Sequence, residues 1–285
     1  MPFQHATGPF LEPLRVAIHL ALNRLPGPLA AFVLFGLKQA WACLFGGAML
    51  GLLITTKYLW SPDWPVHRYD ALFAAAILIQ AAMLVFRLET LEEVKVIFVY
   101  HVVGTLMEVF KVHVGSWAYP EASIVQIAGV PLFSGFMYGS VGSYMARVIR
   151  VFDMRFARFP APLWTFLLAT AIYLNFFLHH FTYDTRILLF VATVLVYGRV
   201  RIHFTVGHSV YWMPLVLAAF LTSFFMWVAE NVGTFTGTWV YPGQEVWHLV
   251  SLQKMGSWYL LLFISFTLVT LVVPIRGPDV QAPSN

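Results

Sequence analysis

Residues 209–231 read SVYWMPLVLAAFLTSFFMWVAEN, and Glu230 is the only charged residue in this stretch. About 20 mostly apolar residues suffice for a helix to cross a bilayer, because the hydrocarbon core is about 30 Å thick and each helical residue rises about 1.5 Å. The stretch therefore predicts a transmembrane helix. Comparable apolar stretches recur along most of the chain, which indicates an integral membrane protein with no soluble domain of any size.

The overall composition agrees with this interpretation. Apolar residues make up 60% of the chain, charged residues only 11%, and the mean hydropathy is +0.76. A soluble domain usually has roughly a quarter charged residues. The formal net charge is only +4 and the basic residues form no continuous patch, so we expect no nucleic-acid partner.

The expected fold class is all-α, a polytopic transmembrane bundle of about eight helices. Residues 10–25 are amphipathic and suit a helix lying in the membrane interface. We therefore expect an N-terminal cytoplasmic segment over 1–28, one transmembrane domain over 29–275 and a cytoplasmic tail over 276–285. The expected spans are 29–56, 70–87, 94–113, 123–149 (kinked at Gly129-Val-Pro131), 162–179, 185–202, 209–231 and 257–275.

Basic residues predict the orientation of these spans, because loops rich in Lys and Arg stay in the cytoplasm. An inner N-terminus places twelve basic residues inside and five outside, so both termini are expected to be cytoplasmic, in the inner (plasma) membrane of the cell. The four arginines of 147–158 are expected to contact solvent or lipid headgroups. The cluster of Glu89, Glu92, Glu93 and Lys95 suggests a solvated helix start. No removable signal peptide is expected.

A repeated motif is the most specific feature of the sequence. Residues 108–120 read EVFKVHVGSWAYP and residues 230–242 read ENVGTFTGTWVYP. Both fit Glu-x6-Gly-[Ser/Thr]-Trp-x-Tyr-Pro, with an offset of 122 residues between Glu108 and Glu230. The copies end the third and seventh expected spans, so both should face the same side, which predicts an internal parallel repeat.

Each part of the motif has a structural and a functional interpretation. Tryptophan and tyrosine favour the membrane interface, and glycine and proline end helices, so a purely structural belt is one interpretation. The other is that the four motif aromatics line a substrate site: Trp117, Tyr119, Trp239 and Tyr241. The carboxylates Glu108 and Glu230 are expensive at membrane depth and suggest a catalytic pair; the alternative is an ion pair with Lys111 or Lys254.

Further polar residues are expected at the same membrane level. His101 lies two helical turns before Glu108 on the same face, and Asn175 and His179 share a face at i, i+4. We therefore add His101 and His179 to the catalytic candidates, and Asn175 and Lys254 to the substrate-binding candidates.

The stretches HVVGTLMEVFKVHVGSWAYPE, GVPLFSGFMYGSVGSY, IYLNFFLHH and WVAENVGTFTGTWVYP resemble the YoaT-like family of bacterial integral membrane proteins of unknown function. The resemblance covers about residues 95–270 and implies no established activity. A fainter similarity, over Glu108, Gly115 to Tyr119 and Gly129-Val-Pro131, is to carotenoid hydratase and lycopene-cyclase-type membrane enzymes. This chain has Gly-Ser-Trp where those enzymes commonly have Pro-Phe-Gly-Tyr.

Several functions follow as hypotheses. The first is an intramembrane enzyme that performs acid–base chemistry on an apolar, isoprenoid-like lipid, with Glu108 and Glu230 as acid and base. The second is a zinc hydrolase using a glutamate with His101, His179, His180 or Asp184, although no His-Glu-x-x-His or Cys-x-x-Cys motif is present. The third is a proton-coupled transporter or small-molecule-binding protein, and the fourth a structural or assembly role.

These hypotheses leave the cofactor, any metal and the oligomeric state open. The expected partners are membrane lipids and an apolar small-molecule ligand. The only cysteine, Cys43, excludes an intrachain disulfide.

Overall fold

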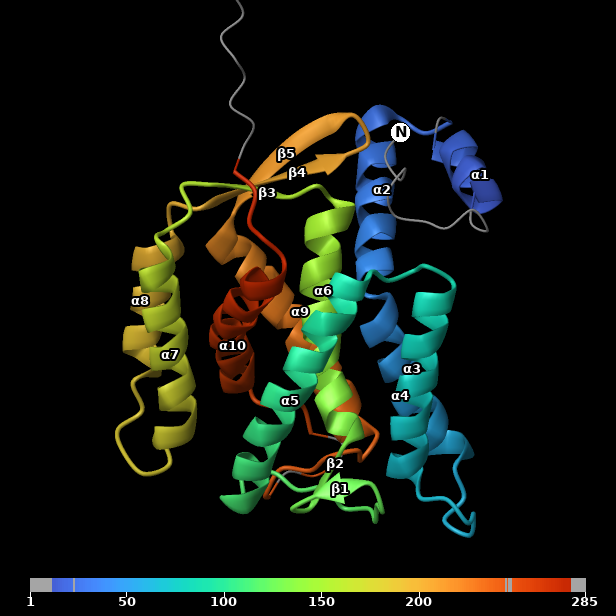
Figure 1. The fold of residues 1–285 in the computed structure, drawn as a ribbon, viewed down its shortest axis with the longest axis vertical. Helices are drawn as coiled ribbons and strands as arrows, with labels where there is room; N and C mark the ends of the chain where they lie inside the picture. The colour runs from blue at the N-terminus through green and yellow to red at the C-terminus, as the bar shows by residue number, and fades with distance from the viewer. Residues whose placement is uncertain (1–11, 23, 244, 246–247, 278–285) are drawn as a thin grey trace, which may run out of the picture. The chain divides into compact units, whose positions relative to one another are not determined.

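The computed structural model describes residues 12–22, 24–243, 245 and 248–277 (Figure 1). Most of this part of the chain is helical, because long apolar runs satisfy their backbone hydrogen bonds internally only as helices. The helices are α1 (Glu12–Leu22), α2 (Gly27–Ala42), α3 (Leu44–Leu59), α4 (Arg68–Val85), α5 (Leu91–His113), α6 (Phe133–Val151), α7 (Pro162–Leu178), α8 (Arg186–Tyr197), α9 (Leu215–Phe235) and α10 (Leu252–Val272).

Two small sheets join this helical framework, so the all-α expectation is corrected. β1 (Gln126–Ile127) and β2 (Val130–Pro131) pair antiparallel around Gly129, whose φ of +80° allows the tight turn. The second sheet has the order β3-β4-β5, formed by β3 (Arg155–Ala157), β4 (Arg201–Val206) and β5 (Ser209–Pro214). The β4–β5 hairpin occupies the first residues of the expected 209–231 span, and α9 therefore begins only at Leu215.

Four helices of the described chain are long and apolar enough to cross a membrane: α4, α5, α9 and α10. A fifth candidate is the pair α2 and α3, which is bent by 69° at its break. The helices α7 and α8 are apolar but only 17 and 12 residues long, below the roughly 20 residues that a bilayer requires. The protein is thus membrane-associated, with four or five candidate spans in the described residues where the sequence suggested eight.

The chain divides into two compact units. The first unit comprises Met1–Trp41, Arg147–Leu221 and Leu260–Asn285, and the second comprises Ala42–Ala146 and Thr222–Tyr259. The predicted amphipathic segment 10–25 is represented in the first unit by α1, whereas residues 1–11 and 278–285 of the expected terminal segments lie outside the described residues.

The first unit contains α7 and α8 side by side and the three-stranded sheet (Figure 1). Arg147 is buried, which corrects the expected solvation for one of the four arginines of 147–158, whereas Arg158 is exposed. Lys38 of the same unit is also buried. Arg147 has no exposed surface, and its Nη1 lies 3.4 Å from the carbonyl oxygen of Trp41. Lys38 is 2% exposed, and its ammonium donates to the carbonyl oxygens of Val151 and Thr205, both at 2.9 Å.

The second unit contains α3, α4, α5, the β1–β2 hairpin and both copies of the repeated motif. The start of α5 in this unit is less solvated than expected. Glu89 and Glu93 are buried, and of the four charged residues there only Glu92 and Lys95 form an exposed pair. Glu93 closes a capping box with Thr90, which satisfies two main-chain N–H groups at the start of the helix.

The apolar core of the second unit supports the motif. Leu53, Tyr69, Leu72 and Phe133 have no exposed surface and pack together, with two motif aromatics, Tyr119 and Trp239, against them.

Candidate functional site

Both copies of the motif end their helices in the same way. Gly115 and Gly237 have left-handed backbones, with φ of +71° and +65°. The N–H of the following residue bonds back in each copy, from Ser116 to Lys111 at 2.9 Å and from Thr238 to Gly233 at 3.0 Å. This is the hydrogen-bond pattern of a glycine-terminated helix, in which a left-handed residue lets the chain reverse direction. The chain after each glycine therefore turns back toward its glutamate.

In the first copy the returning aromatic side chains bind the carboxylate. The Trp117 indole N–H donates to Glu108 Oε2 at 2.7 Å, and the Tyr119 hydroxyl donates to the same oxygen at 2.8 Å. Glu108 is 4% exposed, so these hydrogen bonds replace the water that burial removes.

The second copy repeats this arrangement. The Trp239 indole N–H donates to Glu230 Oε1 at 2.8 Å, and the Tyr241 hydroxyl donates to the same oxygen. Glu230 is 6% exposed. The four motif aromatics, which the sequence predicted as substrate-binding residues, thus all donate hydrogen bonds to the two predicted catalytic carboxylates.

The two carboxylates differ in one respect. Glu108 Oε1 accepts a third hydrogen bond, at 2.8 Å, from the hydroxyl of Tyr138 on α6. Glu230 Oε2 accepts none from the described residues. Consequently both oxygens of Glu108 are occupied by donors, while Glu230 keeps one oxygen open to a proton or a ligand.

Sequence reasoning missed Tyr138 as a residue of this site. Its ring lies against Gly104 of α5, where a Cβ atom would come within 2.6 Å of the ring carbon Cγ. A glycine on one helix facing a tyrosine on another is a tertiary relationship, and neither residue belongs to the motif.

The two copies are joined directly through their main chains. Ala118 and Val240, the residues between Trp and Tyr in each motif, exchange two antiparallel hydrogen bonds of 3.0 Å each. The rings of Trp117 and Tyr241 meet edge to face across this junction, with centroids 6.1 Å apart. The two carboxylate sites thus lie in one unit, connected by a short backbone pair.

Lys254, predicted as a binding residue, lies against this junction. Its ammonium is 4.0 Å from the centroid of the Tyr241 ring and 5.6 Å from that of Trp117. Aromatic faces attract cations through their negative electrostatic potential. The hydrogen bonds that Glu108 and Glu230 accept in the described chain come from Trp and Tyr side chains, and the alternative ion pair with Lys111 or Lys254 stays a prediction.

The two motif tyrosines respond to this environment. Burial, followed by the charges of Glu230 and Glu108, raises the pKa of Tyr241 well above its ordinary value of 10.0. Burial and Glu108 raise the pKa of Tyr119 in the same way. Both hydroxyls therefore stay protonated at neutral pH and act as hydrogen-bond donors. The charges of both carboxylates act on Tyr241, so this tyrosine interacts electrostatically with Glu108 as well as with Glu230.

His101 is in the second unit but has no hydrogen bond to Glu108. Its ring packs on Phe136, with centroids 4.6 Å apart, and its Nδ1 would be 2.3 Å from a Cβ atom on Gly135. That nitrogen is buried without a hydrogen-bond partner among the described residues. The proton relay from His101 to Glu108 stays a prediction.

His179 and Asn175 belong to the first unit, where they form a cluster of their own. His179 Nδ1 lies 2.9 Å from the carbonyl oxygen of Asn175, and the Asn175 side chain accepts from the N–H of Thr185 at 3.0 Å. Hydrogen bonds from Arg186 lower the pKa of the nearby Asp184 to about 2. Their predicted role beside Glu108 is untested.

No group of three or more His, Cys, Asp or Glu side chains suited to a metal ion occurs within the described residues. The zinc hypothesis therefore gains no support from the arrangement of its candidate ligands.

Comparisons with known proteins agree with the family resemblance. A family described as "Protein of unknown function (DUF817)" matches residues 31–266. The uncharacterized protein YoaT of Bacillus subtilis (strain 168) is 42% identical over 252 residues, which are 88% of this chain and 94% of that protein. A crystal structure of a cross-linked MvINS trimer aligns with 67% of this chain and 98% of its own, with a TM-score of 0.45 and 15% identity. That structural likeness is too distant to bear on function.

The matched region contains both motif copies, Tyr138 and Lys254, and it extends over most of the chain. The chain belongs to the DUF817 family of proteins of unknown function, to which YoaT is similar.

Proposed function

We propose that this protein binds and releases a proton at Glu230 while it binds or carries a small molecule in the membrane. The observation that carries the proposal is the difference between the two buried carboxylates. Glu108 is held by three donors on both oxygens, whereas the described residues hold Glu230 on one oxygen and place no donor on its Oε2.

Burial gives this difference its chemical consequence. A carboxylate in a candidate membrane span usually faces an interior site, because its exposure to lipid is costly. An ionised carboxylate only accepts hydrogen bonds, whereas a protonated carboxyl also donates one. Glu230 Oε2 is the position where such a proton would be held. Tyr241 contacts Glu230 directly, and the Lys254 ammonium lies against the Tyr241 ring.

Infrared difference spectroscopy tests the proton site directly. Purified protein is titrated between mild acid and mild alkali, and the C=O band of a protonated carboxyl group is followed. We expect a titrating band in the wild type that is absent in Glu230→Gln and present in Glu92→Gln, an exposed glutamate of the same unit. A band that persists in Glu230→Gln would refute the assignment.

A pH-gradient assay tests the carrier role. Wild-type protein and Glu230→Gln are reconstituted into vesicles containing a pH-sensitive dye, and small solutes are added outside. Solute-dependent proton movement in the wild type, lost in the variant, is the expected result. Solute uptake that is indifferent to the gradient would rule out proton coupling.

An enzyme acting on an apolar, isoprenoid-like lipid is the second candidate, and one contact favours it. The faces of Trp117 and Tyr241 hold the Lys254 ammonium, so these aromatic rings can stabilise the positive charge that alkene protonation creates. Mass spectrometry of lipids that co-purify with the wild type and with the Glu108→Gln, Glu230→Gln double variant decides this. A specific apolar lipid retained only by the wild type supports the enzyme, and bulk phospholipid alone in both samples counts against it.

We also infer that the two motifs are a duplication that forms a parallel repeat, within an inner membrane and with cytoplasmic termini. The matching glycine turns and the Ala118–Val240 pair support this arrangement. Since Cys43 is the only cysteine, a Cys43→Ser background permits single-cysteine labelling from either side. Labelling of residues 116 and 238 from opposite sides of the membrane would refute a parallel repeat.

A further inference from the structure

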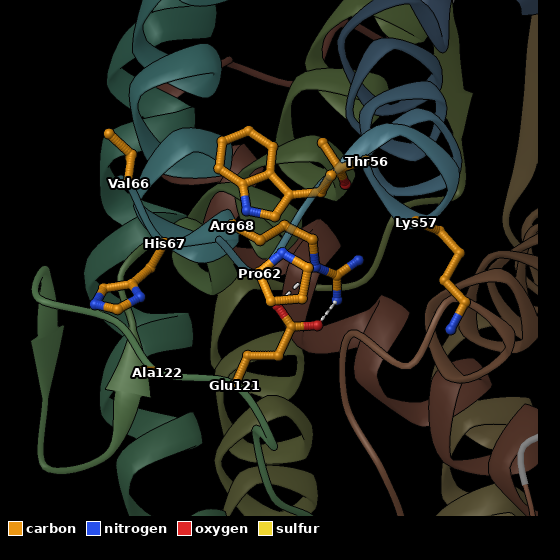
Figure 2. Close-up of a pocket in the computed structure, with 9 residues that line it drawn as sticks. Thr56, Lys57, Pro62, Val66, His67, Arg68, Glu121 and Ala122 are labelled. Carbon is orange, nitrogen blue, oxygen red and sulfur yellow. Dashed lines mark hydrogen bonds and ion pairs between the residues drawn. The ribbon is translucent and has the colours of Figure 1, made fainter. Parts of the chain in front are cut away.

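We infer that the second unit has a binding pocket for a small anion, built around Arg68 at the start of α4. The pocket has a volume of about 370 Å³ and is lined by residues that include Lys57, Trp60, His67, Arg68 and Glu121 (Figure 2). We call it the Arg68 pocket. An anion is thereby named as the chemical class of the small molecule in the proposed function. The pocket itself is inferred independently, and only the role of its ligand rests on the proposed function.

Arg68 supplies the main argument. The residue is 4% exposed, and its guanidinium contacts Glu121 twice, from Nε to Oε2 at 2.8 Å and from Nη2 to Oε1 at 2.6 Å. Its third nitrogen, Nη1, is buried and has no hydrogen-bond partner among the described residues. Figure 2 shows the guanidinium between Glu121 and the side of the pocket where Lys57 lies. A buried cationic donor without a partner is unfavourable, and an anion in the pocket would satisfy it.

The charges around the pocket favour an anion. Lys57 and Arg68 contribute two positive charges against the one negative charge of Glu121 when His67 is neutral. Lys57 is exposed at the end of α3, so its flexible side chain is available to a ligand. Glu121 binds one edge of the Arg68 guanidinium. The other edge of the guanidinium and the Lys57 ammonium together attract one negatively charged group.

The helix start adds to this attraction. α4 begins at Arg68, and its N-cap residue, His67, makes no side-chain capping hydrogen bond. The first N–H groups of a helix and its dipole attract anions. Asp70 in the same turn is committed elsewhere, since its carboxylate accepts from the N–H groups of Ile124 at 2.9 Å and Val125 at 2.9 Å.

Size and lining define the ligand further. A volume of 370 Å³ corresponds to about a dozen waters at about 30 Å³ each, which admits a small organic anion and exceeds what a bare inorganic ion needs. Trp60 and Val66 give the pocket apolar walls. The expected ligand thus has one carboxylate or phosphate group on a short apolar body, which a soluble metabolite or a lipid headgroup with its glycerol could each provide.

Residues that line or adjoin the Arg68 pocket connect it to both copies of the motif. Glu121 directly follows Pro120, the last residue of the first copy. Lys57 Nζ lies 3.7 Å from the position of a Cβ atom on Gly237 in the second copy. Tyr69, next to Arg68, donates from its hydroxyl to the carbonyl oxygen of Thr238 at 2.8 Å. An anion bound at Arg68 is therefore connected, through Glu121, Lys57 and Tyr69, to the segments that hold Glu108 and Glu230.

Anion binding to the full-length protein in detergent tests the pocket. Inorganic phosphate and hexanoate are titrated by calorimetry against wild type, Lys57→Gln and Arg68→Gln, with Lys95→Gln as the control because Lys95 is exposed in the same unit and pairs with Glu92. We expect saturable binding that each pocket variant weakens about tenfold or more, and that Lys95→Gln leaves unchanged. Lys57→Gln removes only an exposed side chain and keeps the test valid if Arg68→Gln does not fold.

A second arm identifies the source of the anion. The protein is placed in nanodiscs of phosphatidylcholine alone or with phosphatidylglycerol, and its thermal unfolding is compared for the same variants. Stabilisation by phosphatidylglycerol that Lys57→Gln removes assigns a lipid headgroup, and binding of hexanoate or phosphate alone assigns a soluble anion. No saturable binding in either arm, or binding equal in wild type and both pocket variants, overturns the inference.

The two proposals fail separately. If the Glu230 carboxyl band is missing from the infrared titration while anions still bind, the proposed function falls and the Arg68 pocket stands. If the band titrates but no anion binds, the reverse holds.

Discussion

The main chains of Ala118 and Val240 exchange two hydrogen bonds of 3.0 Å each, and this pair joins two motifs that lie 122 residues apart in the sequence. Each residue stands between the Trp and the Tyr that hold the glutamate of its own motif. The two carboxylate sites are therefore joined through the backbone, and their differences can be tested with matched variants.

Glutamine substitution should affect the two sites unequally. A glutamine at 108 places its NH₂ group against the Tyr138 hydroxyl, which must then accept instead of donate, and all three hydrogen bonds lose any charge assistance. We therefore expect Glu108→Gln to lower the free energy of unfolding by about 2–3 kcal/mol. Glu230→Gln can keep its oxygen on Trp239 and Tyr241, and we expect a loss of about 1 kcal/mol or less. Denaturant unfolding in detergent, followed by tryptophan fluorescence, measures both. Equal losses would contradict the asymmetry.

Removal of the Tyr138 hydroxyl should cost less stability in Glu108→Gln than in the wild type. In Tyr138→Phe alone, Glu108 loses one charge-assisted hydrogen bond, worth about 1.5–3 kcal/mol. In the double variant, the glutamine NH₂ can face the phenylalanine while its oxygen accepts from Trp117 and Tyr119. The losses in free energy of unfolding of the two single variants should therefore sum to about 0.5 kcal/mol or more above the loss of the double variant. Additive losses would mean that Tyr138 and Glu108 do not act on one another.

Alanine at the motif glycines should destabilise the protein through the backbone. Gly115 and Gly237 have φ of +71° and +65°, and an L-residue there costs about 1–2 kcal/mol. Gly51, within α3 and with open space at its Cβ position, is the control. Gly51→Ala should be neutral or stabilise by up to about 1 kcal/mol, because alanine favours helix. Comparable effects of all three substitutions on the thermal midpoint would rule out a specific role for the glycine turns.

A larger loss is expected at Gly233. A Cβ atom there would be 2.0 Å from two carbons of the Trp239 ring, so the indole could no longer reach Glu230. Gly233→Ala should therefore cost more than Gly237→Ala, and should change the near-ultraviolet circular dichroism that reports tryptophan packing. An unchanged spectrum would show that the ring has another place to lie.

The alkaline limit of stability should depend on Tyr241. Its pKa is raised in the folded protein, whereas in the unfolded chain it titrates near 10.0. Its contribution is thus fully present below pH 10 and is lost as the pH rises toward the folded pKa, because the unfolded state releases the proton first. Thermal midpoints between pH 7 and 11 measure this, and Tyr241→Phe should decline less steeply above pH 10 than the wild type. Parallel curves would contradict the shift.

The sequence by itself determined the class of the protein and the position of its motifs. Apolar runs located α4, α5 and α10 to within a few residues, because the cost of unpaired backbone in a bilayer acts on each segment independently. The Glu-x6-Gly-Ser/Thr-Trp-x-Tyr-Pro spacing also indicated where α5 and α9 end, since a glycine that adopts positive φ is a local feature. The family followed from the same residues and was confirmed.

Tertiary structure decided what these residues contact. Tyr138 reaches Glu108 only because Gly104 leaves room for its ring, Ala118 meets Val240 only because both chains turn back, and Arg68 is buried beside Glu121 only after α4 packs. The β4–β5 hairpin likewise displaced the start of α9, although residues 209–214 are apolar enough to continue a span. Such contacts depend on the packing of segments distant in sequence, and periodicity and composition are properties of each segment alone.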